Sequence, residues 1–199
     1  GRRLWGQARP DWGLAVVLVP WFNWLYAGDQ QTAESAWPMM TGYMDYLFEY
    51  EVSGHLIKKG FAWGDWCPPG SNEKMDTAPQ LSASALYYQS AEALRTMAKL
   101  LGKLDEERKY EQLSKAIKAA FNAEFFNADS GDYGSQTATV MALHVGLVPV
   151  NQRDAVAKAL VERIMKVNKG HYTTGILGHR GLYTVLNDAG HNDTTDLLL

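Results

Sequence analysis

The sequence predicts an all-α protein assembled from helical hairpins. Over most of its 199 residues, apolar side chains recur at spacings of three and four, the period of an amphipathic helix, whereas the alternating pattern of strands is scarce. Four apolar helical runs are each followed by a glycine, namely Gly28, Gly102, Gly146 and Gly190. Polar residues that begin helices follow within a few positions: Asp29 and Thr32, Asp105, Asn151, and Asn192 to Thr194. A glycine end followed by a new helix start is how one helix turns back into an antiparallel neighbour.

The positions of these glycines indicate how the hairpins repeat. Gly28 and Gly102 are 74 positions apart, and the next two intervals are both 44 positions. Equal periods predict stacked hairpins, and the longer first interval holds an insertion at about residues 53–79 that is rich in Gly, Pro and Trp. Four hairpins in series fit an open solenoid or about two-thirds of a closed ring of six hairpins, an (α/α)6 barrel.

The character of individual helices favours the ring. The first expected helix, at 12–27, is apolar almost all round, which is typical of an inner helix buried on several sides. The helix expected at 105–126 carries charged residues on one side, which is typical of an outer helix. Its apolar stripe consists of Tyr110, Leu113, Ile117, Ala120 and Phe121. The other helices are expected at 32–52, 81–101, 134–147, 152–167 and 174–189, with a last one from about residue 192.

Composition excludes several classes of function. Nineteen Lys and Arg against 22 Asp and Glu give a formal net charge of −3, so the chain lacks the basic surface of a nucleic-acid-binding domain. Its longest uncharged apolar stretch, 14–26, is shorter than the ~20 residues that a membrane span needs. The five histidines show no metal-ligand spacing, so metal binding is not expected. No other cofactor is predicted. The single cysteine, Cys67, excludes an intramolecular disulfide, is expected to be a buried small residue, and leaves the compartment open.

Residues 60–70, Gly-Phe-Ala-Trp-Gly-Asp-Trp-Cys-Pro-Pro-Gly, are the most informative stretch of the insertion. Glycines and a double proline predict an ordered, non-helical loop, in which Trp63 and Trp66 flank Asp65. Tryptophan faces stack on sugar rings and aspartate accepts hydrogen bonds from sugar hydroxyls, so one interpretation is a carbohydrate pocket. In the other, the tryptophans anchor a long loop on the core and Asp65 caps a turn. The residues alone leave these two interpretations evenly balanced.

Two further sets of residues carry expectations. Trp21, Trp24 and Trp37 lie on helical stripes and are expected in the core, whereas Trp5, Trp12, Trp63 and Trp66 lie near helix ends or in loops and are candidates for one aromatic-lined mouth. His171 and His179 flank the glycine-containing segment 173–178, for which close packing between helices is favoured over the lining of a pocket.

Five segments, taken in order, carry a resemblance that covers nearly the whole chain. They are Pro-Asp-Trp-Gly to Gly-Asp at 10–29, Gly-Asp-Trp-Cys-Pro-Pro-Gly at 64–70, Tyr87-Tyr88, Tyr-Gly-Ser-Gln-Thr-Ala at 133–138, and His-Tyr-Thr-Thr-Gly-Ile-Leu-Gly at 171–178. Together they resemble the catalytic domain of bacterial α-L-rhamnosidases. The resemblance implies an (α/α)6 barrel of six helical hairpins, in agreement with the 44-residue period. It also implies hydrolysis of terminal α-L-rhamnose from glycosides, with inversion at the anomeric carbon.

The resemblance further implies which residues take part. An inverting glycosidase uses one carboxylic acid to protonate the leaving oxygen and a second carboxylate to activate water. In the family these are glutamates before the Pro-x-Trp-Gly motif and beyond the Thr-Thr-Gly-Ile-Leu-Gly motif, in segments that this chain does not contain, so no catalytic residue is expected within it. The residues that match the sugar-binding wall are Trp12, which would pack near the sugar, and Asp65 and Trp66, which would contact it.

The leading prediction is therefore part of an inverting α-L-rhamnosidase that acts on a rhamnosylated glycoside or polysaccharide. Since the chain starts without a methionine and stops inside its last expected helix, residues 1–199 are expected to be an internal piece of the catalytic domain. A related (α/α)6 glycosidase for another sugar stays open, because fold alone does not fix substrate. A non-catalytic helical-repeat binding module also stays open, although such a scaffold gives no reason for two loop tryptophans around an aspartate.

Overall fold

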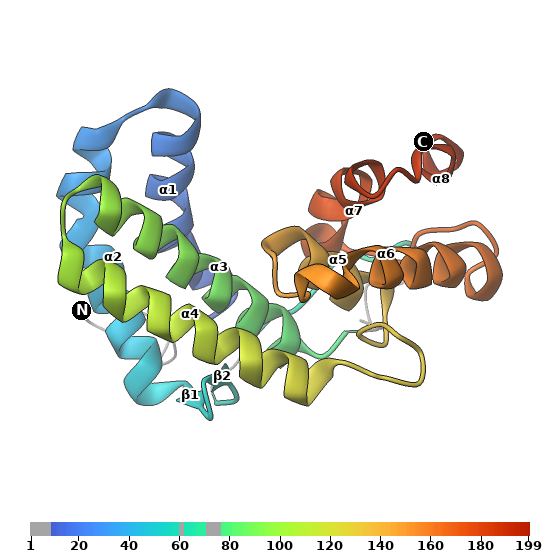
Figure 1. The fold of residues 1–199 in the computed structure, drawn as a ribbon, viewed down its shortest axis with the longest axis horizontal. Coiled ribbons are helices and arrows are strands. Elements are labelled where there is room, and N and C mark those ends of the chain that lie inside the picture. The colour runs from blue at the N-terminus through green and yellow to red at the C-terminus, as the bar shows by residue number, and fades with distance from the viewer. Residues whose placement is uncertain (1–8, 60–61, 71–76) are drawn as a thin grey trace. The chain divides into compact units, whose positions relative to one another are not determined.

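The computed structural model describes residues 9–59, 62–70 and 77–199 (Figure 1). Within these residues the regular secondary structure is helical apart from one short two-stranded hairpin and one isolated bridge, Asn127 to Asp132, so the predicted all-α class is confirmed. The α-helices are α1 (Ala15–Ala27), α2 (Gln30–Tyr50), α3 (Pro79–Leu100), α4 (Leu104–Phe125), α5 (Gln136–Val145), α6 (Arg153–Glu162), α7 (Ile176–Asp188) and α8 (Asn192–Leu198). Short 3-10 turns, Trp12–Leu14 and Val150–Gln152, precede α1 and α6, and a π-helical turn, Arg163–Val167, continues α6.

The helices belong to two compact units, each of which has its own contacts. The first unit comprises Gly1–Trp63 and Leu86–Ala120, and the second comprises Gly64–Ala85 and Phe121–Leu199. Helices α3 and α4 therefore contribute residues to both units.

The predicted glycine ends of the helices are confirmed. Gly28 and Gly146 adopt the left-handed conformation directly after α1 and α5, with φ of +67° and +87°. Gly102 and Gly190 adopt it after α3 and α7, with φ of +67° and +78°. Because a Cβ atom disfavours this conformation by ~1–2 kcal/mol, glycine suits each of these hairpin turns.

The predicted polar helix starts are only partly confirmed. Asp29 caps α2, because its carboxylate accepts a hydrogen bond from the Thr32 amide at 3.0 Å. Asp105 and Asn192 instead lie within the first turns of α4 and α8, and Asn151 lies in the 3-10 turn before α6. Acidic residues in a first turn favour the helix through its dipole without acting as the cap.

In the first unit, α1 packs against α2, and α2 is tied to α4. The buried rings of Trp37 and Tyr110 meet edge to face at 6.4 Å, and Lys109 Nζ lies 3.2 Å from the Asp45 carboxylate. The stripe predicted for α4 is buried at Tyr110, Ile117 and Phe121, and half-buried at Leu113 and Ala120. The charged side of the helix lies toward solvent, as an outer helix requires.

Two expectations for the first unit are met only in part. Helix α1 is not buried on several sides: Val19, Leu25 and Tyr26 are 61%, 48% and 80% exposed. Of the three tryptophans expected in the core, Trp37 is buried, whereas Trp21 and Trp24 are half-buried and stack on each other at 5.1 Å. An apolar composition shows that a helix tolerates burial, but coverage depends on which elements pack on it. Trp5 lies outside the described residues.

In the second unit, α5 packs against α6 and α7, and α7 packs against α8. The approach of α5 to α7 depends on glycines. A Cβ atom at Gly178 would lie 2.7 Å from Thr137 Oγ1, and one at Gly181 would lie 2.8 Å from His144 Cγ. The close packing favoured for segment 173–178 is therefore confirmed.

The insertion at about 53–79 begins with a hairpin that the sequence analysis did not anticipate. Strand β1 (Val52–Ser53) pairs antiparallel with β2 (Leu56–Ile57), and the turn residues Gly54 and His55 both have positive φ, +59° and +66°. Positive φ at both central residues is the mark of a tight two-residue hairpin turn. The remaining described part of the insertion is non-helical up to Pro79, as predicted. Across the described residues, none of the helices combines the length and apolar character that crossing a bilayer requires.

Candidate functional site

The carboxylate of Asp65 lies at the N-terminus of α7, within the second unit. Its Oδ2 accepts hydrogen bonds from the Thr137 hydroxyl and from the Gly175 amide, the latter at 2.6 Å. Its Oδ1 accepts from the amides of Leu177 at 2.8 Å and Gly178 at 3.1 Å. An ionised carboxylate offers about four acceptor positions, and here protein donors use all of them. Asp65 is 2% exposed. Its hydrogen bonds from the backbone amides of 175, 177 and 178 agree with the interpretation in which Asp65 caps a turn.

The backbone beside Asp65 adds to this connection. The Trp66 carbonyl accepts a hydrogen bond from the Ile176 amide at 2.8 Å, so four successive amides, 175–178, bond to Asp65 or Trp66. A Cβ atom at Gly175 would overlap the Trp66 carbonyl and lie 2.9 Å from the carbonyl and Oδ1 of Asp65. Gly175 has an ordinary φ of −87°, so glycine is needed there for space rather than for conformation.

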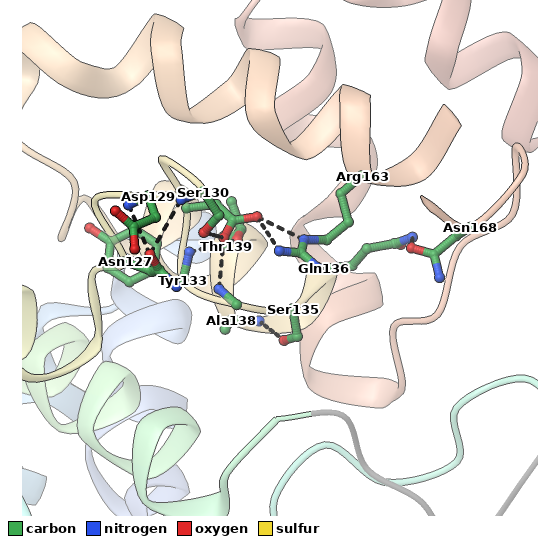
Figure 2. Close-up of polar contacts among 12 residues, drawn as sticks. Asn127, Asp129, Ser130, Tyr133, Ser135, Gln136, Ala138, Thr139, Arg163 and Asn168 are labelled. Atoms are coloured by element: carbon green, nitrogen blue, oxygen red, sulfur yellow. Dashed lines mark hydrogen bonds and ion pairs between the residues drawn. The ribbon is translucent and has the colours of Figure 1, made fainter. Parts of the chain in front are cut away.

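The first turn of α5 holds two other segments in place. Ser135 caps the helix, with its hydroxyl accepting from the Ala138 amide at 3.0 Å (Figure 2). The side-chain Nε2 of the fully buried Gln136 donates to Asn168 Oδ1 at 2.9 Å and to the His171 backbone carbonyl at 3.0 Å. The side-chain Oε1 of Gln136 accepts from the Thr173 amide at 3.0 Å. Because Thr137 bonds Asp65, the three motifs at 64–70, 133–138 and 171–178 meet at this turn.

Several hydrogen bonds hold the turn that leads into α5 (Figure 2). The Asn127 side chain accepts from the amides of Asp129 and Ser130, and the Tyr133 amide donates to Thr139 Oγ1 at 3.2 Å. The Tyr133 hydroxyl donates to Asn122 Oδ1 at 2.6 Å, and burial raises the pKa of Tyr133 to about 12. Sequence reasoning did not identify this network, although Asn, Asp, Ser and Gly at 127–131 are the residues that form such turns.

The residues predicted to bind sugar are distributed over both units. Trp66 follows the buried Asp65 but is 47% exposed. Trp12, in the first unit, is 43% exposed and begins the 3-10 turn that Asp11 caps through the Trp12 amide at 2.8 Å. Trp63 belongs to the first unit too, where the Arg9 guanidinium lies 5.3 Å from its ring. A sugar contact for Trp12, Asp65 or Trp66 stays a prediction.

Cys67 corrects one expectation. It is exposed rather than buried, and its φ is +58°. A cysteine in the loop after Trp66 is covered only if another element packs on it, and the sequence around Cys67 does not indicate that.

The sequence did not predict an aromatic row that runs from the segment before α7 onto that helix. The ring of His179 lies 4.8 Å from that of Tyr172 and 5.2 Å from that of Tyr183, and its Nδ1 is 3.4 Å from the Thr174 hydroxyl. The signal was present as aromatic residues spaced for one helix face at 179 and 183. Within the part of the chain that the structure describes, no cluster of three or more His, Cys, Asp or Glu side chains could hold a metal ion.

Comparison with known proteins gives consistent matches. A family model described as the bacterial alpha-L-rhamnosidase 6 hairpin glycosidase domain matches residues 2–199. An alpha-L-rhamnosidase of Formosa agariphila is 36% identical over 97% of this chain and 21% of its own length, and one of Streptomyces avermitilis is 33% identical over 98% of this chain and 18% of its own length.

Solved structures show the same likeness. The alpha-L-rhamnosidase from Dictyoglumus thermophilum is similar with a TM-score of 0.88 and 28% identity, over 96% of this chain and 22% of that chain. The Streptomyces avermitilis alpha-L-rhamnosidase complexed with L-rhamnose is similar with a TM-score of 0.82 and 33% identity, over 94% of this chain and 17% of that chain. The chain thus spans about a fifth of the length of the curated relatives that it matches.

Proposed function

The chain belongs to the bacterial α-L-rhamnosidase six-hairpin glycosidase domain family, and on this basis we propose that the protein hydrolyses terminal α-L-rhamnose from glycosides or polysaccharides. The observation that carries the proposal is the family match over residues 2–199, supported by curated relatives named alpha-L-rhamnosidase. A similar chain has been solved as a complex with L-rhamnose, which supports rhamnose as the sugar.

The proposed reaction inverts the anomeric carbon. In such a reaction a carboxylic acid protonates the leaving oxygen and a carboxylate activates water from the opposite face, the two standing ~6.5–9.5 Å apart. Residues 1–199 form an internal part of the (α/α)6 catalytic domain in this proposal, and the acid and base are glutamates outside them. The environment of Asp65 supports that assignment, because its two oxygens accept four hydrogen bonds from the protein, which leaves no acceptor position for a substrate.

In this proposal the chain contributes residues that bind the rhamnose: Asp65 and Trp66 from the second unit and, as a separate contribution, Trp12 from the first unit. Trp12 and Trp66 suit stacking against the C–H surface of a sugar ring, since both are more than 40% exposed at their positions beside a helix start or in a loop. Tryptophans that serve only the core would be covered by their neighbours, as Trp37 is.

The test is hydrolysis by the intact protein of para-nitrophenyl α-L-rhamnoside beside a panel of other aryl glycosides. We expect cleavage of the rhamnoside alone, with β-L-rhamnose as the first anomer seen by proton NMR, and no turnover by residues 1–199 on their own. Cleavage of another sugar instead would establish a related glycosidase of different specificity. Absence of cleavage throughout the panel would favour the non-catalytic binding module, and α-L-rhamnose as first product would contradict inversion.

A further inference from the structure

We infer that Asp65 serves the rhamnose site as a positioning residue: it fastens the Gly64–Trp66 loop to the N-terminus of α7 and so fixes the indole of Trp66 as a face for the sugar. This inference rests on the proposed function for the sugar that it names, but the fastening itself can be measured without a sugar. It assigns to Asp65 an effect through Trp66 in place of the direct contact that the motif suggests.

The first argument is the use of the acceptor positions of Asp65. Thr137, Gly175, Leu177 and Gly178 supply four donors to two oxygens. A sugar hydroxyl could bond Asp65 only by displacing one of these donors, which would then be buried without a partner. Thr137, Gly175 and Gly178 are all buried, as Asp65 is, so these donors have little access to water that could replace the carboxylate.

The second argument is the contrast between adjacent residues. Asp65 is 2% exposed, whereas Trp66 is 47% exposed. Asp65 is therefore held inside the protein, and the residue that follows it is accessible to solvent. The Trp66 carbonyl is also bonded to α7, through the Ile176 amide at 2.8 Å. The side chain of Asp65 and the backbone carbonyl of Trp66 are therefore both bonded to the N-terminus of α7. These bonds limit how far the Trp66 indole can move.

The third argument is the backbone of the loop. Gly64 has a φ of +75°, and Cys67 has a φ of +58° although it carries a Cβ atom. A residue other than glycine keeps this conformation only where its surroundings determine it. Between these two positions, Asp65 and Trp66 accept five hydrogen bonds from Thr137 and the amides of 175–178, and these bonds hold the loop in its conformation.

Three variants of the intact protein test the inference. Asp65→Asn keeps the side-chain size but replaces one acceptor oxygen with an NH2 group, which cannot accept from its two donors. Thr137→Val is milder, because it removes one buried donor to Asp65 and leaves the aspartate unchanged. Thr139→Val is the matched control, since Thr139 is equally buried on α5 and its hydroxyl bonds the Tyr133 amide.

Two measurements are made on each variant. Hydrogen exchange of the amides at 175–178 reports the fastening, and the dissociation constant of L-rhamnose from calorimetry reports its effect on the site. We expect faster exchange in Asp65→Asn and Thr137→Val but not in Thr139→Val. We expect rhamnose to bind roughly tenfold more weakly to Asp65→Asn and roughly threefold more weakly to Thr137→Val, with unchanged binding to the control. In the aryl rhamnoside assay the change should appear in KM, with kcat within about twofold of the parent value, because neither acid nor base is altered.

A double-mutant cycle separates positioning from contact. If Asp65 acts through Trp66, Asp65→Asn has no further effect on rhamnose binding in a Trp66→Ala background. Additive losses, together with wild-type affinity in Thr137→Val, would overturn the inference and make Asp65 a direct ligand. Should the intact protein cleave another glycoside, the same cycle applies to that sugar. Should it bind no sugar, the proposed function fails, and unchanged exchange at 175–178 in Asp65→Asn would refute the fastening separately.

Discussion

The carboxylate of Asp132 and the guanidinium of Arg163 form an ion pair in which Asp132 Oδ2 lies 2.7 Å from both Nε and Nη2 of the arginine. The Asp132 side chain is 3% exposed and also accepts hydrogen bonds from the Ser130 hydroxyl and the Gly134 amide. The pair connects the turn before α5 with the π-helical turn after α6, in which Figure 2 labels Arg163. It therefore secures the start of α5, whose first turn bonds Asp65 through Thr137.

Replacing Arg163 should lower the free energy of unfolding. Arg163→Met leaves the buried Asp132 carboxylate without its counter-charge, so we expect a loss of about 3 kcal/mol in the free energy of unfolding, measured by urea denaturation. Lys115→Met is the control, because it removes the exposed ion pair with Glu111 and should leave the unfolding midpoint unchanged. Equal midpoints for the two variants would show that the Asp132–Arg163 pair contributes nothing to the fold.

Two glycines should respond to substitution for different reasons. Gly175→Ala places a Cβ atom against the carbonyls of Asp65 and Trp66, which are backbone atoms that cannot move aside, so we expect a loss of about 3 kcal/mol. Gly28→Ala meets no atom within 4 Å but must adopt a φ of +67°, so we expect a loss of about 1 kcal/mol.

Asparagine distinguishes the two causes. It tolerates the left-handed conformation but is larger than alanine. Gly28→Asn should therefore recover part of the stability that Gly28→Ala loses, whereas Gly175→Asn should be worse than Gly175→Ala. Thermal unfolding of the four variants measures both differences, and recovery at position 175 would contradict a steric cause there.

Local patterns were enough to predict most of the fold. The helices and their glycine ends follow from apolar spacing and from the positive φ that glycine allows, and both signals lie within a few residues of the feature that they predict. The exposed face of α1 could not be predicted in this way, because composition does not say which elements cover a helix. The conformation of Cys67 has no local signal either, since its positive φ depends on how the loop is held.

The candidate site could be predicted only in part. The sequence identified Asp65 as unusual and left binding and capping evenly balanced, because the donors that decide its environment lie 72 to 113 positions away. The resemblance pointed to the segments at 133–138 and 171–178 without indicating that Gln136 and Thr137 would bond the other two motifs. Such a network is a property of packing between distant segments, and no single stretch of sequence encodes it.

The helix cap at Asp29 predicts a pH dependence of stability. Hydrogen bonds from the hydroxyl and the amide of Thr32 lower the pKa of Asp29 below its usual value, which burial only partly opposes. Because the pKa is lower in the folded chain, the unfolded chain binds more protons in acid. The stabilisation is thus complete above the unfolded pKa of about 3.9 and is lost as the pH falls through the folded value.

Unfolding midpoints measured from pH 6 to pH 2.5 should fall more steeply for the parent than for Asp29→Asn, which still caps but does not titrate. Parallel curves would exclude Asp29 as a source of acid sensitivity.

The cap of α5 should matter for both the fold and the site. Ser135→Ala removes the acceptor of the Ala138 amide and the partner of the Thr77 hydroxyl, whose oxygen lies 2.5 Å from that of Ser135. We expect a loss of about 1–2 kcal/mol in the free energy of unfolding, because a buried cap and a buried hydroxyl both lose a partner. Ser135→Asp keeps an acceptor for the Ala138 amide and should restore part of that stability. Ser35→Ala on α2 is the control, since the exposed Ser35 hydroxyl bonds the helix carbonyl of Gln31 and alanine favours the helix.

Because the first turn of α5 also carries Gln136 and Thr137, Ser135→Ala should in addition speed hydrogen exchange of the amides at 173–178. A stability loss without faster exchange there would show that the cap does not support the Asp65 network.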